Sequence, residues 1–283
     1  MSCARYILPF RNKAYPLYPP RIMGIINITP DSFSDGGEAY KPEDAVRRAE
    51  WLIQEGADIL DLGAVSTRPG ASEVSEQEEL QRLLPALRLI RKFFPEVPIS
   101  IDTYRGNVAK IAIEEGADLI NDISGGAFDP KLWSVVSQYK VPYVLMHIQG
   151  TPQTMQQNPT YTNLIEEIWE YFVKKLNNLR ELGIEDVIID PGFGFGKTAA
   201  HNYALFRALP KFRRLGRPIL IGISRKSMLW RTLNATPHTV LPAMTALHWE
   251  ALRKGVCILR VHDVAPARQL VSLLTAWNSF ASA

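Results

Sequence analysis

Groups that can do chemistry recur directly after the short apolar runs of this sequence. Reading along the chain, they belong to Asn27, Asp61, Asp102, Asn121 with Asp122, His147, Asp190, Ser224, and Arg260 with His262. A polar residue after one apolar run has a structural explanation as good as a functional one. Because all eight runs end in this way, we expect a functional site among these residues.

The candidate site combines both signs of charge. Its aspartates would repel one another unless cations or hydrogen-bond donors lay between them; they are Asp61, Asp102 and Asp190. Cationic groups are available from Arg68, Lys226, Arg260 and His262. Such a pocket suits a ligand with a nitrogen-rich heterocyclic edge and an anionic group. Arg260 and His262 lie two residues apart, on one side of a strand, where they could bind a dianion such as diphosphate.

The glycine-rich segment 191–198 only superficially resembles nucleotide-binding motifs. It ends like a P-loop, but Pro191 stands where that pattern requires glycine. It also fails the pattern GxGxxG, because Lys197 replaces the third glycine. We expect its glycines to let the backbone and two Phe rings approach a flat ligand. We interpret His147 as a hydrogen-bonded structural residue, and no motif indicates a covalent nucleophile.

Eight apolar runs rich in Ile, Leu and Val are expected to position these groups. They cover residues 22–28, 58–62, 98–101, 118–120, 142–146, 186–189, 218–223 and 256–261. The segments between several of them show helical spacing, for example at Ala45, Ala49, Leu52 and Ile53. Buried strands joined by helices require a parallel sheet, and eight such units match a closed (β/α)₈ barrel. A doubly wound open sheet is the alternative fold.

The sequence Glu-Gly-Ala-Asp occurs twice, at residues 55–58 and 115–118, with looser versions at 182–184 and 254–256. A glycine there supplies the left-handed residue that ends a helix, and the apolar run that follows begins a strand. The repeats therefore predict turns from helix to strand. In a (β/α)₈ barrel the residues that follow the strands meet at one end, where these barrels have their active sites.

Composition predicts one globular domain. The chain has 283 residues, of which 46% are hydrophobic and 22% charged, so disordered, collagen-like and disulfide-rich classes are excluded. We expect a barrel domain over residues 21–283 after an N-terminal extension over residues 1–20. The net charge is +3 without a basic stripe, so no nucleic-acid partner is expected. With no long apolar segment and no metal-type or disulfide-type cysteine spacing, we expect a cytoplasmic protein without a membrane partner.

Taken together, several segments resemble the dihydropteroate synthase family. Residues 23–37 read MGIINITPDSFSDGG, and further similar segments lie at 61–70, 100–103, 121–122, 146–156, 190–197, 224–227 and 260–264. They follow the order of the family over about residues 21–270. The resemblance implies a pterin-binding (β/α)₈ barrel. It also implies a transferase that joins 6-hydroxymethyl-7,8-dihydropterin diphosphate to 4-aminobenzoate, giving diphosphate and 7,8-dihydropteroate for folate synthesis.

The resemblance also implies roles for particular residues. The pterin is expected to contact Asp102, Asn121, Met146, Asp190, Phe195, Lys226 and Arg260, with Asp61 in support. The aminobenzoate site would comprise Phe33, Thr67, Pro69, Phe195, Ser224 and Ser227. The diphosphate would contact Asn27, Thr67, Arg68, Arg260 and His262, and Asn27 is the expected ligand of a Mg²⁺ cofactor. Catalytic roles fall on Asp35, Arg68, Lys226, Arg260 and His262.

The reaction implied by the resemblance begins with loss of diphosphate. The neutral amine of 4-aminobenzoate then attacks a cationic pterin methylene. Mg²⁺, Arg260 and His262 would take up negative charge on the leaving group, while Asp35 or the retained diphosphate steadies the cation. By the same similarity, the protein is expected to form a homodimer and to be inhibited by sulfonamides.

Two other functions are compatible with parts of the pattern. A pterin-binding domain of a corrinoid-dependent methyltransferase would need the pterin residues but neither a diphosphate nor an aminobenzoate site. A non-catalytic pterin-binding paralogue is the second alternative. Segments 66–69 and 224–226 favour the synthase. The chain departs from the family pattern at Ala64-Val65, where Gly-Glu is common, and at Trp230, where a smaller residue is expected.

Overall fold

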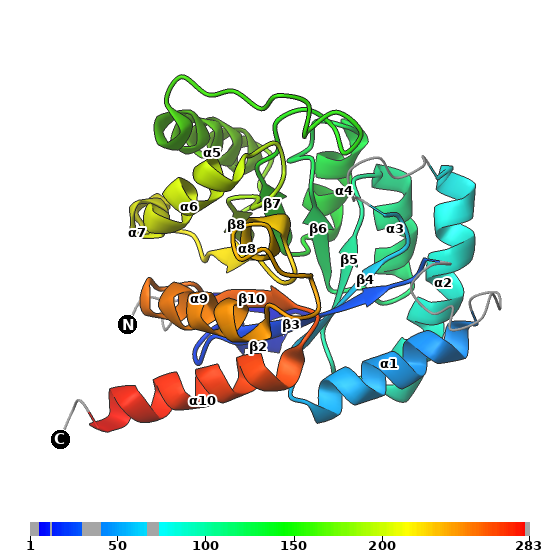
Figure 1. The fold of residues 1–283 in the computed structure, drawn as a ribbon. Helices are drawn as coiled ribbons and strands as arrows, with labels where there is room; N and C mark the ends of the chain where they lie inside the picture. Colours follow the sequence, from blue (N-terminus) through cyan, green and yellow to red (C-terminus); the bar gives the residue numbers. More distant parts are fainter. Residues whose placement is uncertain (1–5, 12, 30–40, 67–73, 281–283) are drawn as a thin grey trace.

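Eight parallel strands form a barrel in the computed structural model, which describes residues 6–11, 13–29, 41–66 and 74–280 (Figure 1). The strands are β3 (Arg21–Asn27), β4 (Ile59–Gly63), β5 (Ile99–Asp102), β6 (Leu119–Asp122), β7 (Tyr143–Met146), β8 (Val187–Asp190), β9 (Leu220–Ile221) and β10 (Ile258–Val261). Their spatial order is β8-β7-β6-β5-β4-β3-β10-β9. A parallel bridge between Ile189 and Ile219 joins β8 to the start of β9. The (β/α)₈ barrel is confirmed, and the open doubly wound sheet is wrong.

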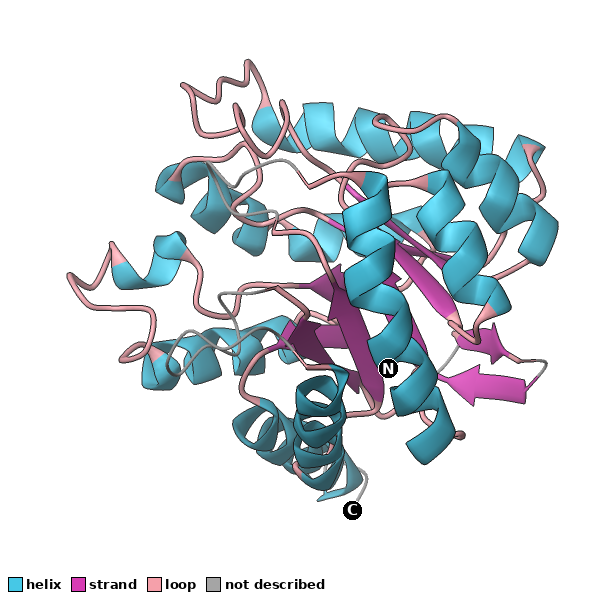
Figure 2. Cartoon of the chain, turned by 90° about the vertical axis from the view of Figure 1, so that its right-hand side faces the viewer, coloured by secondary structure: helices cyan, strands magenta, loops and turns pink. Residues whose placement is uncertain are grey.

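Helices follow the strands and enclose them (Figure 2). The longer ones are α1 (Pro42–Gln54), α2 (Glu76–Phe93), α3 (Gly106–Glu114), α4 (Lys131–Tyr139), α5 (Leu164–Glu181), α6 (Ala199–Arg207), α9 (Leu241–Arg253) and α10 (Val264–Phe280). Short helices are α7 (Leu209–Phe212), α8 (Ser227–Trp230) and the 3₁₀ helix η3 (Arg213–Leu215). In α1, three of the four residues predicted by helical spacing are buried: Ala45, Ala49 and Leu52. The fourth, Ile53, is partly buried and packs against the core.

The two Glu-Gly-Ala-Asp repeats build the same turn at the amino-terminal end of the barrel. Gly56 and Gly116 have φ angles of 101° and 99°, in the left-handed region that glycine adopts without strain. The carboxylate of Asp58 accepts a hydrogen bond from the Ile22 amide at 2.8 Å. The repeat's second aspartate, Asp118, accepts one from the Ile99 amide, also at 2.8 Å. The predicted turns are therefore confirmed, and their aspartates hold the neighbouring strands.

The sequence did not predict the antiparallel hairpin formed by β1 (Ile7–Phe10) and β2 (Lys13–Pro16). Leu8, Phe10 and Leu17 are buried against residues inside the barrel at the amino-terminal ends of the strands. The described part of the N-terminal extension thus closes this end. The interior can open only at the opposite end.

The barrel interior changes from apolar to polar along its axis. Inward-facing residues at the closed end form one apolar cluster that includes Ile59, Leu119, Ile188 and Ile258. Because side chains alternate along a strand, the residue two positions later points the same way. Those residues are Asp61, Asn121, Asp190 and Arg260. Because of this alternation, four of the polar candidate side chains point into the barrel interior.

Two further features concern the chain as a whole. Within the described ranges, no helix is both long and apolar enough to cross a membrane. Cys257, which is buried near the closed end, is disulfide-bonded. The cysteine spacing did not indicate a disulfide, so this expectation is corrected. The other cysteine, Cys3, lies outside the described residues.

Candidate active site

Arg260 lies at the centre of the polar cluster at the carboxyl ends of the strands. Its Nε donates to Asp61 Oδ2 at 2.6 Å, and its Nη2 donates to Asp102 Oδ2 at 2.7 Å. Asn121 Nδ2 also donates to Asp61 Oδ2, at 3.2 Å. Strands β10, β4, β5 and β6 thus contribute one side chain each. This arrangement satisfies the requirement that a cation separate the aspartates.

Burial sets the electrostatics of this cluster. Burial disfavours a charged Arg260, but Asp61 and Asp102 outweigh that effect and raise its pKa, so the guanidinium stays charged. Burial raises the pKa of Asp102 to about 7, even though Arg260 acts in the opposite direction. Asp61 Oδ1 is buried and has no hydrogen-bond partner among the described residues. The cluster therefore contains one carboxyl group, that of Asp102, with a pKa near neutral pH. It also contains one acceptor, Asp61 Oδ1, without a hydrogen bond from the described residues.

Asp190 and Lys226 form the second part of the site, beside the glycine-rich loop after β8. Asp190 Oδ1 accepts a hydrogen bond from the Gly192 amide at 2.7 Å. Lys226 Nζ donates to the Phe193 carbonyl oxygen and lies 4.2 Å from the centre of the Phe195 ring. Burial raises the pKa of Asp190 and lowers that of Lys226 to about 8. A carboxylate, a buried amine and an aromatic face therefore lie together, as a flat polar ligand requires.

Ser224 and His262 pair across the ends of β9 and β10. Ser224 Oγ lies 3.1 Å from His262 Nδ1 and accepts from the His262 amide at 3.3 Å. Burial, together with Arg260 and Arg225, lowers the pKa of His262 to about 3. The sequence grouped His262 with the cations, but in this structure its ring is neutral at pH 7. A neutral imidazole can still donate one hydrogen bond to an anion.

Arg225 and Asp263 form an ion pair that the sequence analysis missed. Arg225 Nε and Nη2 contact the two Asp263 carboxylate oxygens at 3.1 and 2.6 Å. The pair joins the loop that carries Lys226 to the loop that carries His262. The available signal was position alone, because each residue stands next to a predicted site residue.

Two strand-end residues, Asp122 and His147, make their hydrogen bonds to groups outside the Arg260 cluster. Asp122 accepts hydrogen bonds from the Ser124 and Gly126 amides, both at 2.7 Å, and from the Tyr143 hydroxyl at 2.6 Å. It therefore shapes the loop after β6. His147 Nδ1 lies 2.9 Å from Lys197 Nζ, which confirms its interpretation as a hydrogen-bonded structural residue.

The remaining predicted residues fall into two groups. Asn27 ends β3 and is half-buried, Met146 ends β7 and is buried, and Ser227 begins α8 and is exposed. Five predicted positions lie outside the described residues: Phe33, Asp35, Thr67, Arg68 and Pro69.

The donor set can be tested against the expected Mg²⁺. In the described part of the chain, no group of three or more His, Cys, Asp or Glu side chains could hold a metal ion. Mg²⁺, however, is commonly bound by one or two protein oxygens together with substrate phosphates. The half-buried Asn27 amide at the barrel mouth fits that mode of binding.

Comparisons with known proteins agree with this geometry. A model of the family described as pterin binding enzyme matches residues 23–262. The dihydropteroate synthase of Synechocystis sp. is 45% identical over 258 residues, which cover 90% of this chain and 89% of that protein. The chain belongs to the dihydropteroate synthase family. The family match begins within β3 and ends just after β10.

Solved structures of dihydropteroate synthases have the same fold. The Yersinia pestis dihydropteroate synthase, in a sulfonamide drug complex, has a TM-score of 0.91 at 38% identity, covering 97% of this chain and 100% of that one. The Xanthomonas albilineans dihydropteroate synthase, with 4-aminobenzoic acid, has a TM-score of 0.89 at 37% identity, covering 96% and 98%. These relatives are synthases, which favours the synthase over a corrinoid-dependent methyltransferase domain or a non-catalytic paralogue.

Proposed function

We propose that the chain is a transferase that condenses 6-hydroxymethyl-7,8-dihydropterin diphosphate with 4-aminobenzoate, giving 7,8-dihydropteroate and diphosphate for folate synthesis. The observation that carries the proposal is the set of Asp61, Asp102, Asn121, Asp190, Lys226 and Arg260 at one barrel mouth in a member of this family. Related enzymes with 4-aminobenzoic acid and with a sulfonamide support the choice of second substrate.

The pterin would bind at the Arg260 side of the mouth. Its ring has a nitrogen-rich edge with N–H donors. Carboxylate and amide oxygens can accept hydrogen bonds from these donors. Asp102, Asn121 and Asp190 provide such oxygens around one space. Lys226 would donate to the pterin carbonyl oxygen, and Met146 and Phe195 would cover the ring. The unused Oδ1 of buried Asp61 supports a polar ligand here.

The diphosphate and aminobenzoate would bind further out. His262 would donate a hydrogen bond to the diphosphate beside Arg260, with Thr67 and Arg68 as further predicted contacts. Phe33, Thr67, Pro69, Phe195, Ser224 and Ser227 are the proposed aminobenzoate residues. We propose Asn27 as the protein ligand of Mg²⁺, which would neutralise negative charge on the diphosphate when bound.

The reaction balances as one substitution at the pterin methylene. The bond from this carbon to the bridging oxygen breaks first, and diphosphate leaves with the electron pair. The aminobenzoate nitrogen then forms the new carbon–nitrogen bond and loses one proton. Arg260 and His262 would stabilise charge on the leaving group, while predicted Asp35 or retained diphosphate would stabilise the cation.

Product formation tests this function. Purified protein is incubated with dihydropterin diphosphate, 4-aminobenzoate and Mg²⁺, and dihydropteroate is followed by chromatography. The proposal predicts dihydropteroate formation that a sulfonamide inhibits in competition with 4-aminobenzoate. Tight pterin binding without product would instead support the methyltransferase domain or the non-catalytic paralogue.

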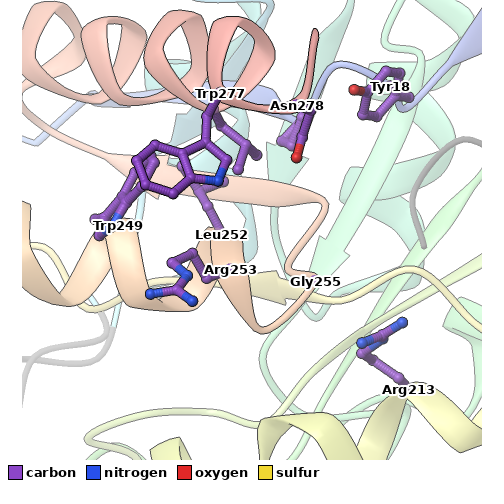
Figure 3. Close-up of a pocket in the computed structure, with 10 residues that line it drawn as sticks. Tyr18, Arg213, Trp249, Leu252, Arg253, Gly255, Trp277 and Asn278 are labelled. Atoms are coloured by element: carbon purple, nitrogen blue, oxygen red, sulfur yellow. The ribbon is translucent and has the colours of Figure 1, made fainter. Parts of the chain in front are cut away.

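We also propose that the chain forms a homodimer through α10. Leu273, Trp277 and Phe280 lie on one stripe of this helix and are 51%, 63% and 79% exposed. Trp277 also packs near Trp249 beside a hollow at the closed end of the barrel (Figure 3). A contiguous exposed apolar stripe is typical of a protein interface, and one stripe pairing with its own copy gives a symmetric dimer.

Light scattering tests the dimer. The wild type should have the mass of two chains, whereas Trp277→Glu should give one. Phe93→Glu is the control, because Phe93 is 59% exposed at the end of α2, on another part of the surface. A wild type with the mass of one chain would contradict the proposal.

A cytoplasmic location stays a prediction. The disulfide at Cys257 bears on it, because disulfides persist mainly in oxidising compartments. Titration of free thiols in protein taken directly from cells tests the location. Two free thiols would favour the cytoplasm, and none would favour an oxidising compartment.

A further inference from the structure

Lys197 is a buried lysine that the proposed reaction does not use. It is 2% exposed, although it ends a motif that resembles a phosphate-binding loop. Its Nζ lies 2.9 Å from each of three atoms: the Gly192 carbonyl oxygen, the Phe195 carbonyl oxygen and His147 Nδ1. An ammonium group has three donors. All three are engaged within the protein, so none is left for a phosphate.

Lys197 is costly to bury. Its hydrogen-bond partners are backbone carbonyl oxygens and an imidazole, and none of them carries a negative charge. A buried ammonium without a carboxylate partner costs several kcal/mol of desolvation. Burial accordingly lowers the pKa of Lys197 well below its ordinary value. The charge of Asp190 acts in the opposite direction but does not outweigh burial, and among the described residues Lys197 forms no ion pair. A buried lysine held in this way beside a mouth of polar groups indicates a functional constraint.

The loop wrapped around Lys197 holds three side chains of the proposed site. The Gly192 amide binds Asp190, and the Phe193 carbonyl oxygen accepts from Lys226. The centre of the Phe195 ring lies 4.2 Å from Lys226 Nζ. A shift of this loop would therefore move the Lys226 amine, which the pterin would use, and the Phe195 ring, which both proposed substrates would use.

The loop is also held from its other sides. Asn202 Oδ1 accepts from the Gly194 amide at 2.7 Å, and its Nδ2 donates to the Thr198 carbonyl oxygen at 2.7 Å. Gly192 lies so close to His147 that a Cβ atom there would overlap the histidine carbonyl oxygen. Lys197 supplies the attraction that pulls two loop carbonyl groups towards the end of β7.

We propose that Lys197 is a positioning residue: its three hydrogen bonds fix the loop 192–196 and, through that loop, the places of Phe195 and Lys226. The inference rests on the proposed function, because it gives that loop's contacts a role in binding both substrates. In this proposal Lys197 binds groups inside the protein, whereas the lysine of a P-loop binds a phosphate.

The test compares Lys197→Met with Lys175→Met in the full chain. Methionine fills similar space without donors. Lys175 is the matched control, since its Nζ also donates to a glycine carbonyl oxygen, that of Gly125 at 2.8 Å, in a different loop. We expect Lys197→Met to raise the pterin dissociation constant and the KM for 4-aminobenzoate by about tenfold or more. Lys175→Met should change either value by less than about twofold.

Hydrogen exchange measures the loop without relying on turnover. Peptides that contain residues 192–196 should exchange faster in Lys197→Met, whereas strand peptides from β4 and β5 keep wild-type rates. Unchanged loop exchange with wild-type affinity for both substrates would overturn the inference. Faster exchange throughout the chain would also overturn it, because Lys197 would then stabilise the whole fold.

The partner histidine provides a second pair of variants. His147→Leu removes the acceptor of Lys197, whereas His147→Asn offers an amide oxygen in its place. We expect His147→Leu to weaken pterin binding and His147→Asn to restore most of it. Equal losses in both variants would contradict the positioning role. If wild-type protein made no dihydropteroate, the proposed function would fail, and pterin affinity with loop exchange would still decide the role of Lys197.

Discussion

At the scale of single residues, the site depends on the hydrogen bonds that Arg260 donates to two aspartates. Its guanidinium joins Asp61 and Asp102, which come from two other strands. The shared cation lets two buried carboxyl groups lie close together. Burial still raises the pKa of Asp102 to about 7. Ligand binding that requires the ionised carboxylate should therefore be coupled to proton release.

Asp102 gives a pH prediction. Below pH 7 this carboxyl group is mostly protonated, and a neutral carboxyl group accepts from a pterin N–H more weakly than the carboxylate does. The affinity for 6-hydroxymethyl-7,8-dihydropterin, which has no diphosphate to titrate, should therefore rise with pH between about 6 and 8. Calorimetry of wild type and Asp102→Asn measures this.

The variant should bind more weakly, and its affinity should lose the pH dependence. Asp186→Asn is the control, because burial also raises the pKa of Asp186, but this residue precedes β8 at the closed end. A wild-type affinity that is constant across this range would refute the role of Asp102.

Arg260→Met should harm both activity and stability. The variant leaves two carboxylates near one another without their cation, which costs about 3 kcal/mol of unfolding free energy. Turnover should fall by about a hundredfold or more, since Arg260 also faces the leaving group in the proposed reaction. Urea unfolding and steady-state kinetics measure the two effects. Wild-type turnover in Arg260→Met would remove Arg260 from the mechanism.

At the scale of elements, the glycine-rich loop after β8 is held by close backbone contacts. Gly192 and Gly183 have similar left-handed φ angles of 71° and 73°. A Cβ atom at Gly192 would overlap the His147 carbonyl oxygen, whereas one at Gly183 would meet nothing within 4 Å. An alanine at Gly183 would therefore introduce backbone strain alone. An alanine at Gly192 would introduce the same strain and also a steric clash with His147.

Gly183→Ala should cost about 1 kcal/mol of stability, from the left-handed conformation alone, and keep full activity. Gly192→Ala should cost more and raise the KM for 4-aminobenzoate, because the loop with Phe195 must move. Urea unfolding and kinetics of both variants test this. Equal effects of the two substitutions on KM would show that the close approach at Gly192 has no role.

The order and positions of the barrel strands could be predicted from the sequence. Apolar runs and left-handed glycines are local signals, and they located all eight barrel strands. The β1–β2 hairpin was missed because each of its strands, ILPF and KAYP, contains a proline, and the left-handed residue near its turn is Arg11 rather than glycine. A proline inside a run argues against a strand, and glycine is the usual signal of a hairpin turn.

Side-chain partners were less predictable than strands. Alternation along the strands placed Asp61, Asn121 and Asp190 in the interior. Which carboxylates Arg260 would bind depends on barrel register, since Asp61 lies 199 residues away in the chain. The Arg225–Asp263 pair and the Phe193 carbonyl group depend on loop geometry, which has no periodic pattern to read.

At the scale of the whole molecule, the barrel separates stability from chemistry. The hairpin and an apolar layer close the amino-terminal end, while the polar groups lie at the carboxyl ends of the strands. Changes at the closed end should therefore alter stability without altering the reaction.

Phe10→Ala tests this separation. Phe10 is 3% exposed and packs into the apolar cluster at the closed end. Removing its ring should lower the unfolding free energy by about 3 kcal/mol or more and leave kcat unchanged where the protein stays folded. Denaturant unfolding and kinetics at low temperature measure both. A changed kcat in fully folded Phe10→Ala would show that the two ends are coupled.

The central claim is that this barrel mouth joins a pterin to 4-aminobenzoate with loss of diphosphate. The most direct test measures diphosphate and dihydropteroate together, in wild type and in Asp190→Asn, with both substrates and Mg²⁺ present. We predict equal amounts of the two products in wild type and a strong loss of both in Asp190→Asn. Diphosphate released without dihydropteroate, or equal turnover in Asp190→Asn, would contradict the account.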